Sequence, residues 1–159
     1  MRKAYVIKYS DEYYEQVVNL QLKPADKKEV EDANGLPYQL TLREAVDTAG
    51  DEMYLIMYNG KVSGFFGVIK SWQEGIGIGY MLTDDNLKHY GRQFTKYTIV
   101  FFKHLLEDYS VLTNYISSES VKSIRWLKRA GVHFDGVEHK LHSKDVIFYR
   151  FEIRKEDYE

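Results

Sequence analysis

An Asn-Gly pair between two apolar runs is the feature that most restricts the fold of this 159-residue chain. The runs are MYLIMY at 53–58 and KVSGFFGVIK at 61–70. A two-residue hairpin turn needs positive φ at both central positions, and Asn59 and Gly60 tolerate it well. The sequence therefore predicts an antiparallel hairpin, and with it a β-sheet.

Hydrophobic spacing predicts the elements around this hairpin. Strands are expected at 4–9, 75–82 and 111–116, and a last hairpin at 133–141 and 146–153. Helices are expected after Ser10-Asp11, at 27–33, from a capping box at Thr41–Glu44 to 49–50, at 87–109, and from Ser120 to Ala130. The strands before and after the long helix should pair in parallel.

This order predicts an α/β (α+β) fold in which helices flank a mixed central sheet of about six to seven strands. A length of 159 residues favours a single domain, residues 1–159. The 14 tyrosines suit either a tyrosine-rich core rim or contact surfaces for other proteins.

Composition excludes several classes of protein. The chain has no cysteine, so disulfides and thiolate metal sites are absent, and its five histidines show no metal spacing. A net charge of −2 gives no reason to expect nucleic acid as a partner. We expect no signal peptide and no membrane span, and hence a cytoplasmic protein.

The stretch SVKSIRWLKRAGVHF at 120–134 predicts a short amphipathic helix held tightly against the next strand. Ser120 offers a cap, Ala130-Gly131 ends the helix, and Phe134 lies in the strand. With the element order, this stretch resembles the GNAT superfamily of acetyl-CoA-dependent N-acetyltransferases. Within it, the runs LTNYI at 112–116 and IRWLK at 124–128 are most similar to the GNAT-like internal virion proteins of short-tailed bacteriophages.

The resemblance implies that the fourth strand, 75–82, splays away from the fifth, 111–116. The pantetheine arm of acetyl-CoA would then pair with the fourth strand. Gly75, Gly77 and Gly79 fall on one face of that strand and permit close approach. The alternative, left open, is that an aromatic side chain from the first helices packs there.

The pyrophosphate would lie where this strand leads into the long helix, at 84–94, because helix N-termini favour anions. The family's glycine-rich loop is reduced here to Gly91, with Lys88, His89 and Arg92 as cations. Asp84 and Asp85 favour another interpretation, a capped helix with a solvated basic face.

For acetyl transfer the resemblance implies catalytic residues in the cleft, for which we name Glu74 as the base and, beside it, Tyr80. The alternative for Glu74 is an exposed loop charge. The position of the family's acidic tyrosine is Leu127, which cannot donate a proton. The other residues expected to bind the cofactor are Met81, Leu82, Thr83, Asn114 and Ser117.

Two functions are therefore expected. One is an acetyl-CoA-dependent N-acetyltransferase that acts on an unidentified amine in the host cytoplasm. The other is an inactive GNAT-scaffold protein that acts through protein contacts in a phage particle. The sheet edges could pair with a second copy or be blunted by charge.

Overall fold

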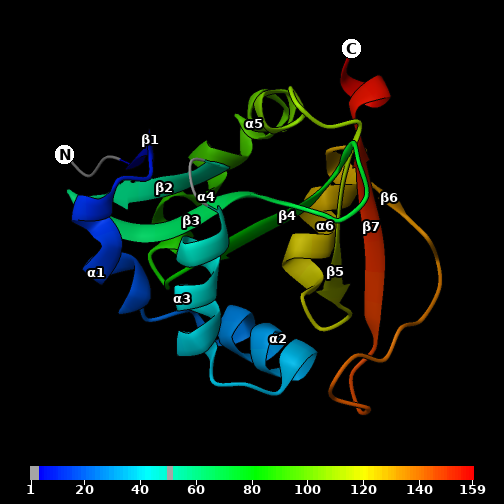
Figure 1. Cartoon of the computed structure of the whole chain (residues 1–159), viewed down its shortest axis with the longest axis horizontal. Coiled ribbons are helices and arrows are strands. Elements are labelled where there is room, and N and C mark those ends of the chain that lie inside the picture. The colour runs from blue at the N-terminus through cyan, green and yellow to red at the C-terminus, as the bar shows by residue number, and fades with distance from the viewer. Residues whose placement is uncertain (1–3, 50–51) are drawn as a thin grey trace.

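The computed structural model describes residues 4–49 and 52–159 and has a seven-stranded sheet at its centre (Figure 1). The strands are β1 (Ala4–Lys8), β2 (Met53–Tyr58), β3 (Lys61–Lys70), β4 (Ile76–Thr83), β5 (Val111–Ser117), β6 (His133–Phe134) and β7 (Phe148–Arg154). Their order across the sheet is β1-β2-β3-β4-β5-β7-β6. Only β4 and β5 run parallel, which confirms the predicted mixed α/β sheet.

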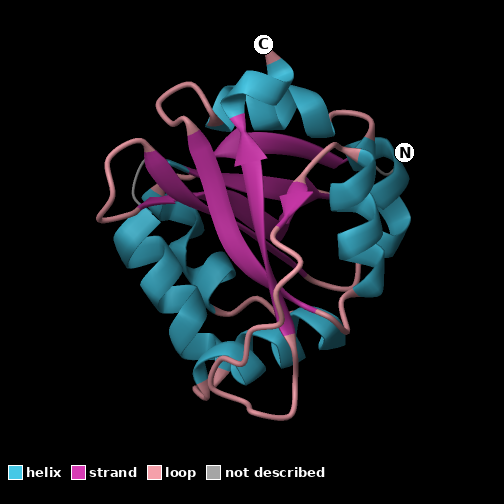
Figure 2. Cartoon of the chain, turned by 90° about the vertical axis from the view of Figure 1, so that its right-hand side faces the viewer, coloured by secondary structure: helices cyan, strands magenta, loops and turns pink. Residues whose placement is uncertain are grey.

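Helices cover both faces of this sheet (Figure 2). They are α1 (Tyr14–Val18), α2 (Pro24–Asn34), α3 (Tyr38–Ala49), α4 (Leu87–Thr95), α5 (Thr98–Leu105) and α6 (Val121–Arg129), with short 3-10 turns at Asp11–Tyr13 and Lys155–Tyr158. On one face, α1 and α3 bury Val17 and Leu42 against Phe65 of β3. On the other, α4, α5 and α6 pack on β3, β4, β5 and β7.

The predicted hairpin is confirmed. Asn59 has a φ of 52° and Gly60 a φ of 79°, the left-handed conformation that the two-residue turn requires. The register then shifts between Ile56 and Met57, because Ser63 is an extra residue on the other strand, a bulge in β3. Seven of the ten residues of β3 are buried in a row, because helices cover this central strand on both sides.

The predicted helix at 87–109 is divided in two. Its break lies between Thr95 and Thr98, where the Thr98 hydroxyl donates to the Thr95 carbonyl and accepts from the Trp126 indole N–H. The apolar spacing continues through the break, but these bonds favour a turn there. The helical chain also ends at Leu105, earlier than predicted.

Two other boundaries and one predicted cap were wrong. Helix α3 begins at Tyr38, so Thr41 lies inside it and forms no capping box, and Gly50 lies outside the described residues. The last hairpin keeps only two residues in β6, since Gly136 at a φ of 71° turns the chain away. Ser120 precedes α6 but makes no capping bond.

Candidate functional site

The two parallel strands at the centre of the sheet are paired over three residues only. Ile76, Gly77 and Ile78 of β4 lie opposite residues 111–113 of β5, and no pairing follows. Beyond this point β4 continues to Thr83 and β5 to Ser117. The strands therefore diverge toward their C-terminal ends and leave a wedge, which confirms the predicted splay.

The side chain of Asn114 stands at the point of divergence. Its Nδ2 donates to the Gly79 carbonyl at 2.8 Å, and its Oδ1 accepts the backbone N–H of Tyr115 at 2.7 Å. One amide group thus satisfies a freed acceptor on β4 and a freed donor on β5. This replaces the next pair of sheet hydrogen bonds and fixes where the wedge begins.

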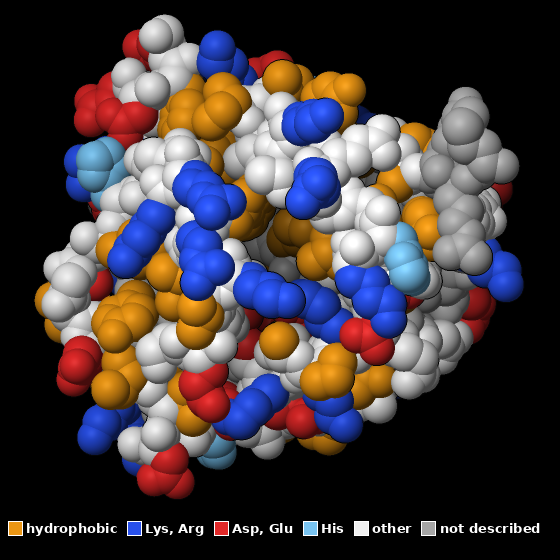
Figure 3. All heavy atoms as spheres, turned by 180° about the vertical axis from the view of Figure 1, so that it is seen from behind, with side chains coloured by type: hydrophobic (Ala, Val, Ile, Leu, Met, Phe, Trp, Pro, Cys, Tyr) orange, Lys and Arg blue, Asp and Glu red, His pale blue; other side chains and the backbone are white. Residues whose placement is uncertain are grey.

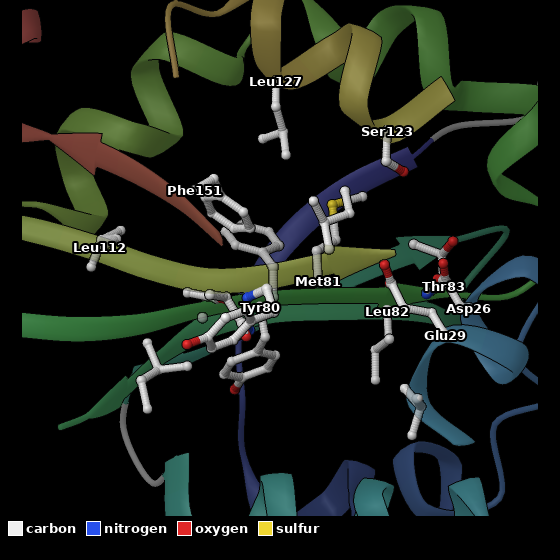
Figure 4. A pocket seen from close by; sticks show the side chains of 18 of the residues that line it. Asp26, Glu29, Tyr80, Met81, Leu82, Thr83, Leu112, Ser123, Leu127 and Phe151 are labelled. Carbon is white, nitrogen blue, oxygen red and sulfur yellow. Dashed lines mark hydrogen bonds between the residues drawn. The ribbon is translucent and has the colours of Figure 1, made fainter. Parts of the chain in front are cut away.

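The beginning of α2 binds the far end of β4 (Figure 4). The N–H of Thr83 donates to Asp26 Oδ2 at 2.9 Å, and the N–H of Lys23 donates to the Thr83 carbonyl at 3.0 Å. Lys23 Nζ also forms an ion pair with the buried carboxylate of Asp26. Both edge groups of Thr83 are therefore satisfied by α2 instead of β5.

One turn further along α2, Glu29 binds the far end of β5. Its Oε1 accepts the N–H of Ser117 at 2.7 Å and the hydroxyl of Ser120 at 3.1 Å. This bond explains why Ser120 does not cap α6. Burial raises the pKa of Glu29 above its ordinary value, although the Ser117 N–H acts in the opposite direction. Both hydrogen bonds use Oε1, so Oε2 is committed to neither.

A cavity of about 830 Å³ occupies the wedge and is lined by residues on both faces of the sheet. On one side it is lined by Thr41, Glu44 and Ala45 of α3. On the other side α4, α5 and α6 line it, and its wall is mostly apolar. Figure 3 shows a hollow on this second face with Lys and Arg side chains gathered around it. The cavity has the size and character of a ligand site.

The predicted site residues divide into two groups. Those that line the cavity are Tyr80, Met81, Leu82, Thr83, Gly91 and Asn114; those outside its lining are Glu74, Lys88, His89, Arg92 and Ser117. Glu74 is exposed in the turn before β4, at the paired end of the strands, away from the open end of the wedge. Lys88, His89 and Arg92 lie exposed on α4 beside lining residues.

Two residues named for their chemistry meet the cavity in different ways. The Tyr80 hydroxyl is buried without a hydrogen-bond partner in the described chain, and burial raises its pKa, so Tyr80 keeps its proton. Leu127 is buried and lines the cavity from α6, where a tyrosine would present a hydroxyl. The position thus faces the site but carries no acid.

The carboxylate of Asp84 occupies the space before the start of α4. Asp84 Oδ1 accepts the N–H of Asn86 at 2.9 Å and the hydroxyl of Ser63 at 2.6 Å. A carboxylate therefore lies just before α4, where the helix would attract an anion, although no side chain caps the helix itself. This end of α4 does not fit a pyrophosphate group.

The glycines of β4 differ in what surrounds them. A Cβ on Gly77 would lie 2.4 Å from Val68 and 3.0 Å from both Tyr109 and Leu112. A Cβ on Gly79 would find only ordinary contacts, the nearest 3.6 Å away on Leu112. Packing thus requires a glycine at 77, because side chains of β3, β5 and the turn after α5 occupy the space beside it, and none comes from the first helices. Gly79 leaves open space beside the wedge.

The three helices on the cavity's second face carry only positive charge. Their charged residues are Lys88, Arg92, Lys103, Lys122, Arg125, Lys128 and Arg129, with no Asp or Glu. Within the described ranges, none of these cations forms an ion pair. The face beside the cavity is therefore suited to an anionic ligand, although the whole chain has a charge of −2.

Sequence reasoning missed Asp26 and Glu29. Both lie in a charged segment whose pattern indicates a solvated helix, and only the fold brings them to the strand ends. In the parts of the chain that the structure describes, no group of three or more potential ligands could hold a metal, and no helix has the length and apolar run to cross a bilayer.

No model of a known protein family matches the chain, and no curated protein does. Solved structures do match. A GNAT-family acetyltransferase from Bacillus anthracis gives a TM-score of 0.69 at 12% identity, over 96% of this chain and 95% of that one. The fold of this chain is the GNAT fold.

Other GNAT-fold matches agree. Ard1 from Thermoplasma volcanium has a TM-score of 0.69 at 13% identity, over 95% of this chain and 97% of its own. The ribosomal-protein-S18-alanine N-acetyltransferase from Escherichia coli has 0.62 at 10% identity, over 96% and 94%. The GNAT fold accounts for the wedge, whereas these identities are too low to transfer an activity.

Proposed function

We propose that this protein is an acetyl-CoA-dependent N-acetyltransferase that acts on an amine. The observation that carries the proposal is the wedge between β4 and β5, with its cavity lined from both faces of the sheet. A thioester carried on a pantetheine arm can enter from the α4–α6 face while an amine approaches from the α3 face. The amine nitrogen then attacks the thioester carbonyl, the C–N bond forms and the thiol leaves.

The residues fit the pantetheine arm better than the diphosphate. In β4 the edge groups of Gly79 and Thr83 point into the wedge, so those of Met81 between them do too. The arm would pair with Met81. Because Asp84 fills the start of α4, the phosphates would bind the exposed cations, among them Lys88, Arg92 and Lys122.

Glu29 is the base that the geometry favours. It lines the cavity, its pKa is raised by burial, and its Oε2 is left free by the bonds to Ser117 and Ser120. Glu74 would have to act from outside the cavity. With no acid at Leu127, the thiolate would take its proton from water.

Calorimetry and a thiol-release assay test this proposal together. Acetyl-CoA should bind with micromolar affinity or better, and thiol should appear when a panel of amines is added. Glu29→Gln should lower kcat by about 10²–10⁴ and leave acetyl-CoA affinity nearly unchanged. Glu74→Gln is the matched control and should keep wild-type kcat. Lack of binding at millimolar acetyl-CoA would refute the proposal.

The carboxylate before α4 and the leucine at 127 favour a second candidate, a GNAT-scaffold protein without catalysis. Its place in a phage particle rests on the sequence resemblance alone. Such a protein should co-purify with virions or with another phage protein. It should also release no thiol from acetyl-CoA with any amine.

A further inference from the structure

The inner end of the cavity extends past the point where β4 and β5 separate. Leu112 lines the cavity on the α5 side of the sheet, yet it lies in the paired part of the strands. Ile153 of β7, which is paired with Leu112, lines it as well. The cavity therefore continues under the closed sheet, beyond the place that a thioester in the wedge would occupy.

This inner end, which we term the inner chamber, is apolar. Its walls are Phe101, Phe102, Leu105, Leu112, Phe151 and Ile153. The nearby polar groups are already satisfied, since the Trp126 indole N–H bonds the Thr98 hydroxyl and that hydroxyl bonds the Thr95 carbonyl. The chamber thus offers hydrocarbon contacts and no free donor or acceptor from these residues.

Gly79 connects the wedge to the chamber. It has no side chain, and the nearest atom to a Cβ built on it is 3.6 Å away, on Leu112. A group leaving the wedge at this level would meet Leu112 and the aromatic residues of α5. An acetyl group brings one methyl to this place and leaves the chamber empty, whereas a longer acyl chain would fill it.

We infer that the preferred acyl donor carries an apolar chain several carbons longer than acetyl. This inference rests on the proposed acyl transfer and names its donor class. Burial of each methylene in an apolar site strengthens binding by about three- to fourfold. The reaction is otherwise unchanged, because the amine displaces the thiol from the same thioester carbonyl.

A titration series of CoA, acetyl-CoA, butyryl-CoA and hexanoyl-CoA tests the inference. The affinity for CoA alone measures binding in the wedge. The change in affinity with each added carbon measures binding in the inner chamber. Affinity should rise from acetyl to hexanoyl by about tenfold for each two carbons. Equal affinity for acetyl and hexanoyl, with CoA bound, would overturn the chamber inference and leave the proposed function intact. Failure of every member to bind would overturn both.

Leu105→Phe places a larger side chain in the chamber. It should remove the gain between butyryl-CoA and hexanoyl-CoA and leave the affinity for CoA as in the wild type. Val100→Phe is the matched control, because Val100 is 61% exposed on the same helix and does not line the cavity. If Leu105→Phe keeps the full chain-length gain, the chain binds elsewhere and the inference is wrong; the wild-type series stands whether or not this variant folds.

Discussion

Single residues define the wedge. Asn114 begins it, because one amide satisfies both strands where they separate. Asp26 and Glu29 end it, each by accepting the last free N–H of one strand. The three side chains together replace several of the hydrogen bonds that β4 and β5 would otherwise make with each other, and they leave Met81 between them without a strand partner. A separated pair of strands can therefore persist inside a folded sheet.

Gly79→Ala should change stability and ligand affinity in opposite directions. A strand glycine costs about 0.5–1 kcal/mol relative to alanine, and the new methyl meets only ordinary contacts, so the free energy of unfolding should increase. The same methyl narrows the passage beside Leu112 and should weaken acyl-CoA binding by about tenfold. Thermal melting and calorimetry would measure the two effects.

Gly77→Ala is the matched control, because its methyl would lie 2.4 Å from Val68 and should destabilise the fold. If Gly79→Ala bound acyl-CoA as tightly as the wild type, the passage would not be where we place it.

The raised pKa of Glu29 gives a pH dependence with a defined sign. Because the folded state holds this proton more firmly, the contribution of Glu29 to the free energy of unfolding falls as pH rises from 4.5, its ordinary pKa, to its raised pKa. Glu29→Gln still accepts the Ser117 N–H but does not titrate. The wild-type value minus the Glu29→Gln value should therefore decrease across this window and level off above it.

Urea titrations at a series of pH values would give that difference, with exposed Glu138→Gln as the reference for loss of a carboxylate. An increase with pH would contradict the burial of Glu29.

At the scale of elements, local signals were sufficient for some parts of the fold. Asn59-Gly60 predicted its hairpin, because a two-residue turn depends on those residues alone. The break between α4 and α5 could not be predicted, since the indole of Trp126, 28 positions away, helps to set it. The bonds from α2 to the strand ends could not be predicted either, because they also join residues far apart in the sequence. Glu29 and Ser117 are separated by 88 positions.

The start of α4 yields a prediction about charge and capping. Asp84→Ala frees the Asn86 N–H and removes a carboxylate near the expected phosphates. Loss of its hydrogen bonds should lower the free energy of unfolding by about 1 kcal/mol, and acetyl-CoA should bind more tightly. Asp85→Ala removes an exposed neighbouring charge that makes no side-chain hydrogen bond in the described structure, so it reports the charge effect alone.

Chemical denaturation of both variants would measure the change in stability, and calorimetry would measure the change in acetyl-CoA affinity. Equal stability losses in the two variants would show that the hydrogen bonds of Asp84 do not stabilise the fold.

At the scale of the whole molecule, charge is segregated. The α4–α6 face is positive, while Asp26, Glu29 and Glu44 line the cavity nearer α2 and α3. An anionic donor and a cationic amine would thus reach the wedge from opposite sides. The fold creates this arrangement, because the sequence alone shows only a near-neutral chain.

This segregation predicts a salt-dependent affinity for CoA. Lys122→Glu should weaken binding by about tenfold at low salt, and the difference should shrink as ionic strength rises. Lys61→Glu, an exposed charge beside the hairpin turn, should have no such effect. Equal losses in both variants would indicate general electrostatics and no site on α4–α6.

Amide hydrogen exchange at Met81 tests the central claim most directly, because this N–H points into the wedge and has no strand partner in the β4–β5 register. In the free protein it should exchange faster than the N–H groups of Gly77 and Thr83, and saturating acetyl-CoA should slow it while leaving α3 unchanged. A Met81 amide that is already fully protected in the free protein, or that exchanges equally fast with and without bound acetyl-CoA, would contradict the account.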